Sequence, residues 1–95
     1  MSNSLAGGWK LEHMKPCDLP QQAATGFSAV AGSPIVGARY VPVLYVGTQI
    51  VAGTNYMILC EQTMSTLGQE RHLVKMVINQ SPENQWSLVS IERIV

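Results

Sequence analysis

The sequence predicts an α+β domain in which one helix covers one face of an antiparallel meander sheet. Residues 19–31 repeat apolar side chains at helical spacing, and from residue 38 onward apolar residues alternate with a period of two. The connections between the alternating runs are short, and short connections join antiparallel neighbours. One helix beside such a sheet leaves the other face open to water or to a partner.

The composition is that of one folded domain. The chain has 95 residues, of which 46% are hydrophobic and 13% charged, so its apolar surface is sufficient to offset chain entropy. We expect a single domain over residues 1–95. Residues 1–17 form its irregular N-terminal arm, because Gly7, Gly8 and Pro16 disfavour regular structure there.

The helix is predicted to begin at Asp18, which would act as its N-cap. Pro20 falls in the first turn and Gln21 falls in the capping-box position three residues after the cap. Gly32 and Pro34 are expected to end the helix. Its apolar face consists of Leu19, Ala23, Phe27, Val30 and Ala31.

Four strands are predicted, over residues 38–50, 54–65, 72–79 and 86–95. Pro42 suggests a sheet edge or a bulge near the start of the first strand. Strict alternation places these groups on common faces: Tyr40, Leu44, Val46 and Ile50; Tyr56, Ile58, Cys60 and Met64; Val74, Met76 and Ile78; Val89, Ile91 and Val95.

The charge content argues against several classes of partner. Six Lys and Arg balance six Asp and Glu, and no basic run would neutralise phosphates, so neither nucleic-acid binding nor an anionic membrane surface is expected. No stretch resembles a signal peptide or a membrane span, which favours a cytoplasmic location unless a leader has been removed.

The reactive side chains do not form a catalytic or metal-binding pattern. Cys17 and Cys60 favour two reduced thiols over a disulfide bridge. His13 and His72 are far apart, and no carboxylate is placed to orient either one. We therefore expect no cofactor, no metal and no enzymatic activity.

The unusual segment is QIVAG, residues 49–53, which lies where the chain must reverse between the first two strands. Turns are normally built from Asn, Asp, Gly, Ser and Pro. Here the reversal offers Ile50, Val51 and Ala52 with the single glycine Gly53. Apolar side chains at such a tip become favourable when a partner removes them from water.

These residues resemble the cystatin family. Residues 49–53 match its Q-x-V-x-G signature, and Thr54-Asn55-Tyr56 extends the match toward the stefin branch. The arm, GGWKLEHMKPCDLP, is similar to the stefin arm, in which a glycine pair leads to Lys-Pro and the helix. The resemblance covers nearly the whole chain, and the absence of the disulfide-bearing half of secreted animal cystatins favours a stefin-like or plant-type-like member.

The resemblance implies a cystatin-like fold with four to five strands, including a short first strand in the arm. It also implies a reversible, tight-binding inhibitor of papain-like, cathepsin-type cysteine proteases. Gly7, Gly8 and Trp9 of the arm, residues 49–53 and Trp86 of the last hairpin would form one apolar wedge that blocks the protease cleft. The resemblance further implies an active monomer and a possible inactive domain-swapped dimer.

Two features keep alternatives open. Many cystatins carry an adjacent Pro-Trp pair in the second hairpin, whereas Pro82 and Trp86 are separated by three residues here. Trp86 is expected to be an exposed anchor, and the alternative is a core residue at the end of the sheet. The alternative function is a non-inhibitory module of the same fold that binds a protein or a ligand.

Overall fold

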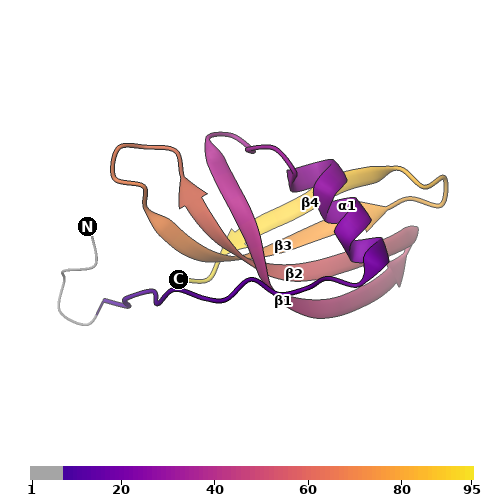
Figure 1. Ribbon diagram of the computed structural model, residues 1–95. Coiled ribbons are helices and arrows are strands. Elements are labelled where there is room, and N and C mark those ends of the chain that lie inside the picture. The colour runs from indigo at the N-terminus through magenta and orange to yellow at the C-terminus, as the bar shows by residue number, and fades with distance from the viewer. Residues whose placement is uncertain (1–7) are drawn as a thin grey trace.

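The computed structural model describes residues 8–95 and contains one helix and one sheet (Figure 1). The strands follow one another across the sheet in the order β1-β2-β3-β4, and every neighbouring pair is antiparallel. This is the predicted α+β meander, consistent with a cystatin-like arrangement. The elements are α1 (Gln21–Ala31), β1 (Ala38–Val51), β2 (Gly53–Met64), β3 (Arg71–Gln80) and β4 (Trp86–Arg93).

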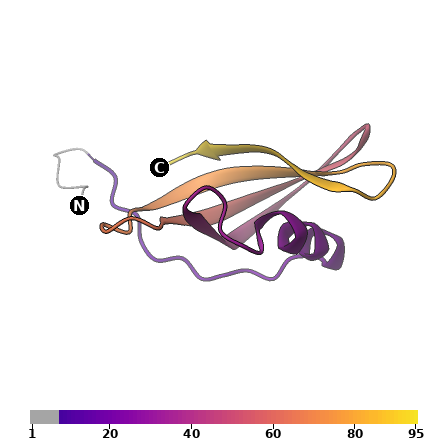
Figure 2. The same cartoon turned by 90° about the horizontal axis from the view of Figure 1, so that it is seen from above.

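The helix covers one face of the sheet, and the opposite face is open (Figure 2). The core lies between these two layers and is built mainly from alternate residues of the two central strands, because these point toward α1. The predicted inward faces of β2 and β3 and the apolar face of α1 are thereby confirmed, except that Met64 of β2 is not part of the core. Fully or largely buried residues are Ala23, Ala31, Tyr56, Ile58, Cys60, Val74, Met76 and Ile78.

The prediction of a helix capped by Asp18 is wrong. The N-cap position belongs to Pro20, and no side chain forms a capping hydrogen bond there. The backbone N–H of Ala24 donates to the Pro20 carbonyl at 2.8 Å, which makes this the first helical hydrogen bond. Helix formation therefore relies on packing of the apolar face more than on a cap. The described part of the chain contains no helix that is long and apolar enough to cross a membrane.

Strand β1 departs from the predicted alternation because it contains two irregularities. Its register against β2 shifts between Pro42 and Leu44 and again between Tyr45 and Gly47. The expected edge or bulge near Pro42 is confirmed, since β1 is also an edge strand. The predicted common face is wrong between the two shifts: Tyr45 packs against the core, and Leu44 is 52% exposed. The second shift restores the alternation, so Ile50, opposite Thr54, returns to the face of Tyr40.

Strand β4 contains a comparable shift. Leu88 lies opposite Ile78 and Ser90 lies opposite Val77, so Val89 is an extra residue in this strand. The bulge reverses the alternation. Leu88 before it and Ile91 after it therefore lie on the same face of the sheet. The prediction that Val89 and Ile91 share a buried face is therefore wrong: Ile91 packs against the core, whereas Val89 is 53% exposed.

From residue 8 onward, the N-terminal arm runs along the sheet, and the described part of it contains no strand. Near its start, Arg71 Nη2 donates to the carbonyl of Leu11 at 3.0 Å, and further on the N–H of Cys17 donates to the Pro42 carbonyl at 3.0 Å. Arg71 belongs to the end of the sheet that carries the β2–β3 loop, residues 65–70, which we name the loop end. The arm therefore leads from the loop end to the opposite end, where α1 begins (Figure 1).

Gly26 allows the helix to approach β4. A Cβ atom at this position would lie 2.3–2.7 Å from three atoms of the Trp86 ring, so any larger residue would overlap the indole. The glycine that weakens the helix by intrinsic propensity is required by this contact.

We predict that Gly26→Ala lowers the free energy of unfolding by about 1–3 kcal/mol through overpacking. Helix propensity alone predicts the opposite, a gain of up to about 1 kcal/mol. Urea unfolding would distinguish the two, with Ser28→Ala on the exposed side of the same helix as the control. A Gly26→Ala variant as stable as the natural chain would refute the tight contact, whereas rescue by Trp86→Phe would support it.

Burial also controls the chemistry of Cys60. Its side chain is fully buried, and both Cys17 and Cys60 are free thiols. Burial, with a smaller contribution from Cys17, raises the pKa of Cys60 from 9.0 to about 12. The folded chain therefore favours the neutral thiol. The contribution of the neutral Cys60 thiol to the free energy of unfolding is complete below pH 9.0, and it is lost as the pH rises toward about 12.

We predict that Cys60 makes the chain less stable in alkaline solution. Up to about 4 kcal/mol of the decline in unfolding free energy between about pH 9 and about pH 12 belongs to this thiol. Urea unfolding as a function of pH would measure the decline, with Cys60→Ala as the comparison. Parallel pH profiles for the two chains would contradict the prediction.

Candidate functional site

The β1–β2 and β3–β4 turns lie at the same end of the sheet, which we name the hairpin end (Figure 1). At the first turn, Val51 lies opposite Gly53, so Ala52 alone forms the tip. Ile50 is 80% exposed and Val51 is 44% exposed, which places two large apolar side chains in water beside the tip. This apolar tip, residues 50–52, is the feature predicted from the sequence.

Gly53 joins the two turns. Its φ of +93° lies in the region that favours glycine, and a Cβ there would lie 2.1 Å from the carbonyl oxygen of Gln80 and 3.0 Å from Cα of Ser81. The close approach at Gly53 is therefore made to the chain's own backbone. A substitution at Gly53 would disturb the fold, so it cannot test binding alone.

Gln80 connects three elements at the hairpin end. Its Oε1 accepts hydrogen bonds from Tyr56 Oη at 3.1 Å and from Gln22 Nε2 at 3.2 Å, and its Nε2 donates to Asn84 Oδ1 at 2.9 Å. One amide side chain therefore holds the start of α1, strand β2 and the β3–β4 turn together. The sequence offers no signal for this role, because isolated glutamines are common on strands.

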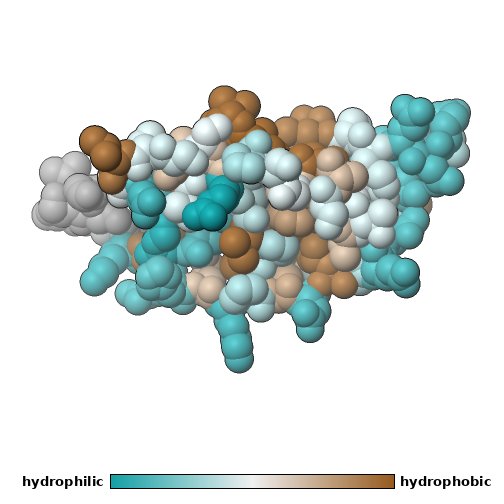
Figure 3. Space-filling view, turned by 45° about the horizontal axis from the view of Figure 1, so that its top comes forward, coloured by the Kyte–Doolittle hydropathy of each residue, from teal (hydrophilic) through white to brown (hydrophobic). Residues whose placement is uncertain are grey.

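The β3–β4 turn, residues 81–85, is ordered by its first residue. Ser81 Oγ accepts from the N–H of Glu83 at 3.2 Å and from the N–H of Gln85 at 3.0 Å, while the Ser81 carbonyl accepts from the N–H of Asn84 at 2.9 Å. Asn84 has a φ of +66°, which asparagine tolerates better than most residues. The second turn is polar, and hydrophilic colour covers this end in Figure 3.

A row of amide side chains crosses the open face behind the tip. Asn79 Nδ2 donates to Asn55 Oδ1 at 2.9 Å, and Asn55 Nδ2 donates to Gln49 Oε1 at 3.1 Å. These residues occupy adjacent strands in the register of the sheet. Gln49, predicted as a site residue, therefore braces the base of the first hairpin.

The prediction that Trp86 is an exposed anchor is wrong. Trp86 is partly buried, packs against the core and lies with its ring centroid 5.4 Å from that of Tyr56. Gly26 of α1 contacts the ring as described above. The structure supports the core alternative. The three residues between Pro82 and Trp86 extend the turn, so the tryptophan falls at the start of β4 instead of at the tip.

The arm residues do not join the hairpins. Gly7 lies outside the described residues. Gly8 and Trp9 precede Leu11, whose carbonyl is bound by Arg71 at the loop end, and Trp9 is 78% exposed there. The predicted three-part wedge is wrong in this respect: the hairpin turns lie together at one end (Figure 1), whereas Gly8 and Trp9 precede the Leu11 carbonyl, which Arg71 binds at the other end.

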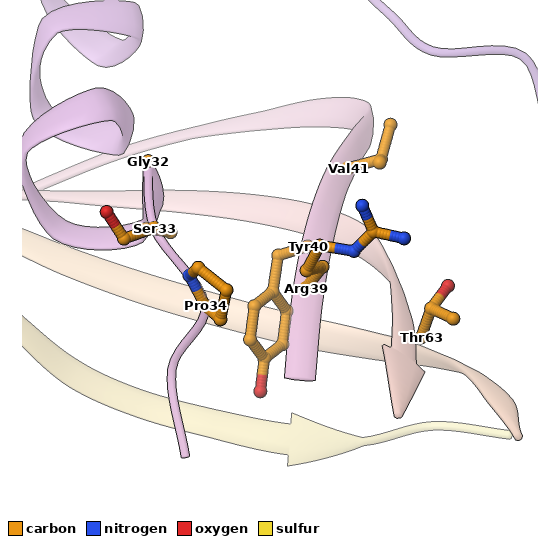
Figure 4. Close-up of a pocket in the computed structure, with 8 residues that line it drawn as sticks. Gly32, Ser33, Pro34, Arg39, Tyr40, Val41 and Thr63 are labelled. Atoms are coloured by element: carbon orange, nitrogen blue, oxygen red, sulfur yellow. The ribbon is translucent and has the colours of Figure 1, made fainter. Parts of the chain in front are cut away.

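A cavity of about 270 Å³ lies elsewhere, between the end of α1 and the edge of the sheet. Arg39 and Tyr40 leave β1 in different directions there and do not converge on one point (Figure 4). Tyr40 Oη accepts from Gln62 Nε2 at 2.8 Å, so this hydroxyl is already paired. Within residues 8–95, no group of three or more His, Cys, Asp or Glu side chains could hold a metal ion.

Comparison with protein-family models, with curated proteins and with solved structures gave no match to this chain. The functional argument therefore depends on the residues and their arrangement.

We predict that Gly53→Ala lowers the free energy of unfolding by about 1–3 kcal/mol, because alanine is strained at positive φ and meets the Gln80 carbonyl. Thermal unfolding would measure the loss. Gly68→Ala is the matched control, since a Cβ at Gly68 contacts nothing within 4 Å. Equal stability of the two variants would mean that Gly53 is an ordinary turn glycine.

Proposed function

We propose that this chain is a reversible inhibitor of papain-like cysteine proteases, and that its apolar tip enters the protease cleft. The observation that carries the proposal is the exposure of Ile50 and Val51 beside a one-residue reversal that is fixed from behind by Gly53 and Gln80. The match of residues 49–53 to the cystatin signature supports the same conclusion.

The arrangement favours binding over chemistry. Burying two large apolar side chains provides the driving force, at roughly 25 cal/mol per Å² of apolar surface. The tip is held by backbone contacts and the second turn by hydrogen bonds within the chain, so little conformational entropy is lost on binding. A protease cannot cleave a segment whose carbonyl is kept out of line with the attacking thiolate.

The proposed interface differs from the wedge implied by the family resemblance. Trp86 supports the helix from inside and takes no direct part in binding. Gly8 and Trp9 belong to the opposite end, so the two hairpin turns alone form the contact. We further propose that the active form is a monomer, that it requires no cofactor and that it acts in the cytoplasm on cathepsin-type enzymes.

The alternative is a non-inhibitory module of the same fold. One observation favours it: Leu44 and Val46 are 52% and 50% exposed on an edge strand away from the tip. A second surface of this kind would serve a protein partner or a ligand without involving a protease. Binding to such a partner by a chain that leaves papain-like enzymes fully active would support this alternative.

The first test is a titration of papain with the purified chain, monitored by hydrolysis of a small fluorogenic peptide. A linear loss of activity that ends near a one-to-one ratio is the expected result. Full protease activity in the presence of a large molar excess would overturn the proposal.

We predict that Ile50→Asp weakens inhibition of papain at least about hundredfold, because a desolvated carboxylate replaces an apolar side chain at the contact. Leu67→Asp provides the control, since Leu67 is also an exposed apolar residue but lies in the β2–β3 loop at the opposite end. Unfolding measurements on both variants would confirm that the fold is retained. A similar inhibition constant for the two variants would exclude the tip from the interface.

A further inference from the structure

The fold separates charges that the sequence distributes along the chain. Arg39 of β1 and Arg71 of β3 both lie opposite Thr63 of β2, so both belong to the loop end. Arg93 lies opposite Val74, in the half of the sheet away from the turns. No Lys or Arg lies at the hairpin end. The six are Lys10, Lys15, Arg39, Arg71, Lys75 and Arg93.

The acidic residues are distributed differently. Glu83 is in the β3–β4 turn, whereas Asp18 follows Cys17, whose N–H donates to the Pro42 carbonyl in the middle of the sheet. The remaining four carboxylates lie with the cations, where Arg71 pairs with Glu61 and Lys75 pairs with Glu92 at 2.9 Å. In a chain of zero formal net charge, the hairpin end therefore carries one carboxylate, Glu83, and no cation.

Glu83 is the charge on the turn that adjoins the β1–β2 hairpin. Its backbone N–H is fixed by Ser81 Oγ, and Ser81 in turn lies against Gly53, where an added Cβ would be 3.0 Å from its Cα. The side chain is exposed and has no ion-pair partner within the described part of the chain. The hairpin end thus combines apolar side chains with one adjacent carboxylate on an ordered turn.

We propose that the hairpin end selects proteases whose cleft has a positively charged rim, with Glu83 as the specificity-determining residue. The inference rests on the proposed protease inhibition, and it further specifies the sign of the charge around the cleft of the protease. A cationic rim would attract the acidic end and orient it toward the cleft, whereas an acidic rim would repel the end that must enter. Because Glu83 is exposed, its main effect is on the association rate.

The experiment uses one protease in two charge states. Papain carboxylates are coupled to a diamine to give a cationic derivative, and papain lysines are succinylated to give an anionic derivative. Turnover of a small uncharged peptide confirms that both active sites remain functional. The association rate constant of each inhibitor is then measured with both derivatives at low and at physiological ionic strength.

The natural chain is expected to associate at least about tenfold faster with cationic than with anionic papain at low ionic strength, and salt should reduce the ratio. Glu83→Lys should lower this ratio at least about threefold. Glu70→Lys is the matched control, because it makes the same change at an exposed side chain of the loop end. It should leave the ratio within about twofold of that of the natural chain.

The outcomes separate the two proposals. Equal ratios for Glu83→Lys and Glu70→Lys, with inhibition intact, would overturn the role of Glu83 and leave the proposed function standing. Inhibition of both derivatives at equal rates by the natural chain would overturn the charge preference. Failure to inhibit either derivative would overturn the proposed function and this inference with it.

Discussion

The close contact between Gly53 and the Gln80 backbone determines the arrangement of the hairpin end. With no side chain at Gly53, the start of β2 reaches the carbonyl of Gln80 and the first residue of the next turn. The side chain of Gln80 extends the same connection to Tyr56, Gln22 and Asn84. Two hairpins that are remote in sequence therefore form one rigid edge, and the exposed tip is supported from behind.

The aromatic residues show that a large apolar side chain used in the core is not available for binding at the surface. Trp86 and Tyr56 pack beneath α1, where Gly26 leaves room for the indole. With Trp86 in the core, the exposed apolar surface at this end is provided by Ile50, Val51 and Ala52. A small domain has few large side chains, and those required to hold the helix on the sheet cannot also serve as anchors.

Regular features of the fold could be predicted from the sequence, and irregular ones could not. Alternation in β2 and β3 identified the core correctly because these central strands contain no bulge. The first of two shifts in β1 and the extra residue in β4 each reverse the alternation, so Leu44 and Val89 face away from the sides assigned to them. Pro42 marks the first shift in β1, whereas no local pattern marks the shift after Tyr45 or the extra residue Val89.

The same distinction between predictable and unpredictable features applies to the candidate site. The apolar tip was recognisable from its composition, because apolar residues at a turn are unusual on local grounds. The inward position of Trp86 depends on its distance from Gly26 in space, and the hub role of Gln80 depends on three partners from different elements. The direction of the arm depends on where Arg71 binds the Leu11 carbonyl, sixty positions away. Each of these is a tertiary contact between residues whose types are unremarkable in sequence.

The position of the arm changes how the proposed inhibitor would achieve affinity. With Gly8 and Trp9 at the loop end, the contact area is limited to two turns, and area alone does not determine binding free energy. The small contact area is compensated by turns that are already ordered in the free chain. They are fixed by the positive φ of Gly53 and Asn84, by the Ser81 hydrogen bonds and by the Gln80 side chain. A small, rigid and charge-polarised edge would therefore depend on orientation and preorganisation, so substitutions that loosen the turns would weaken binding even where they touch no partner.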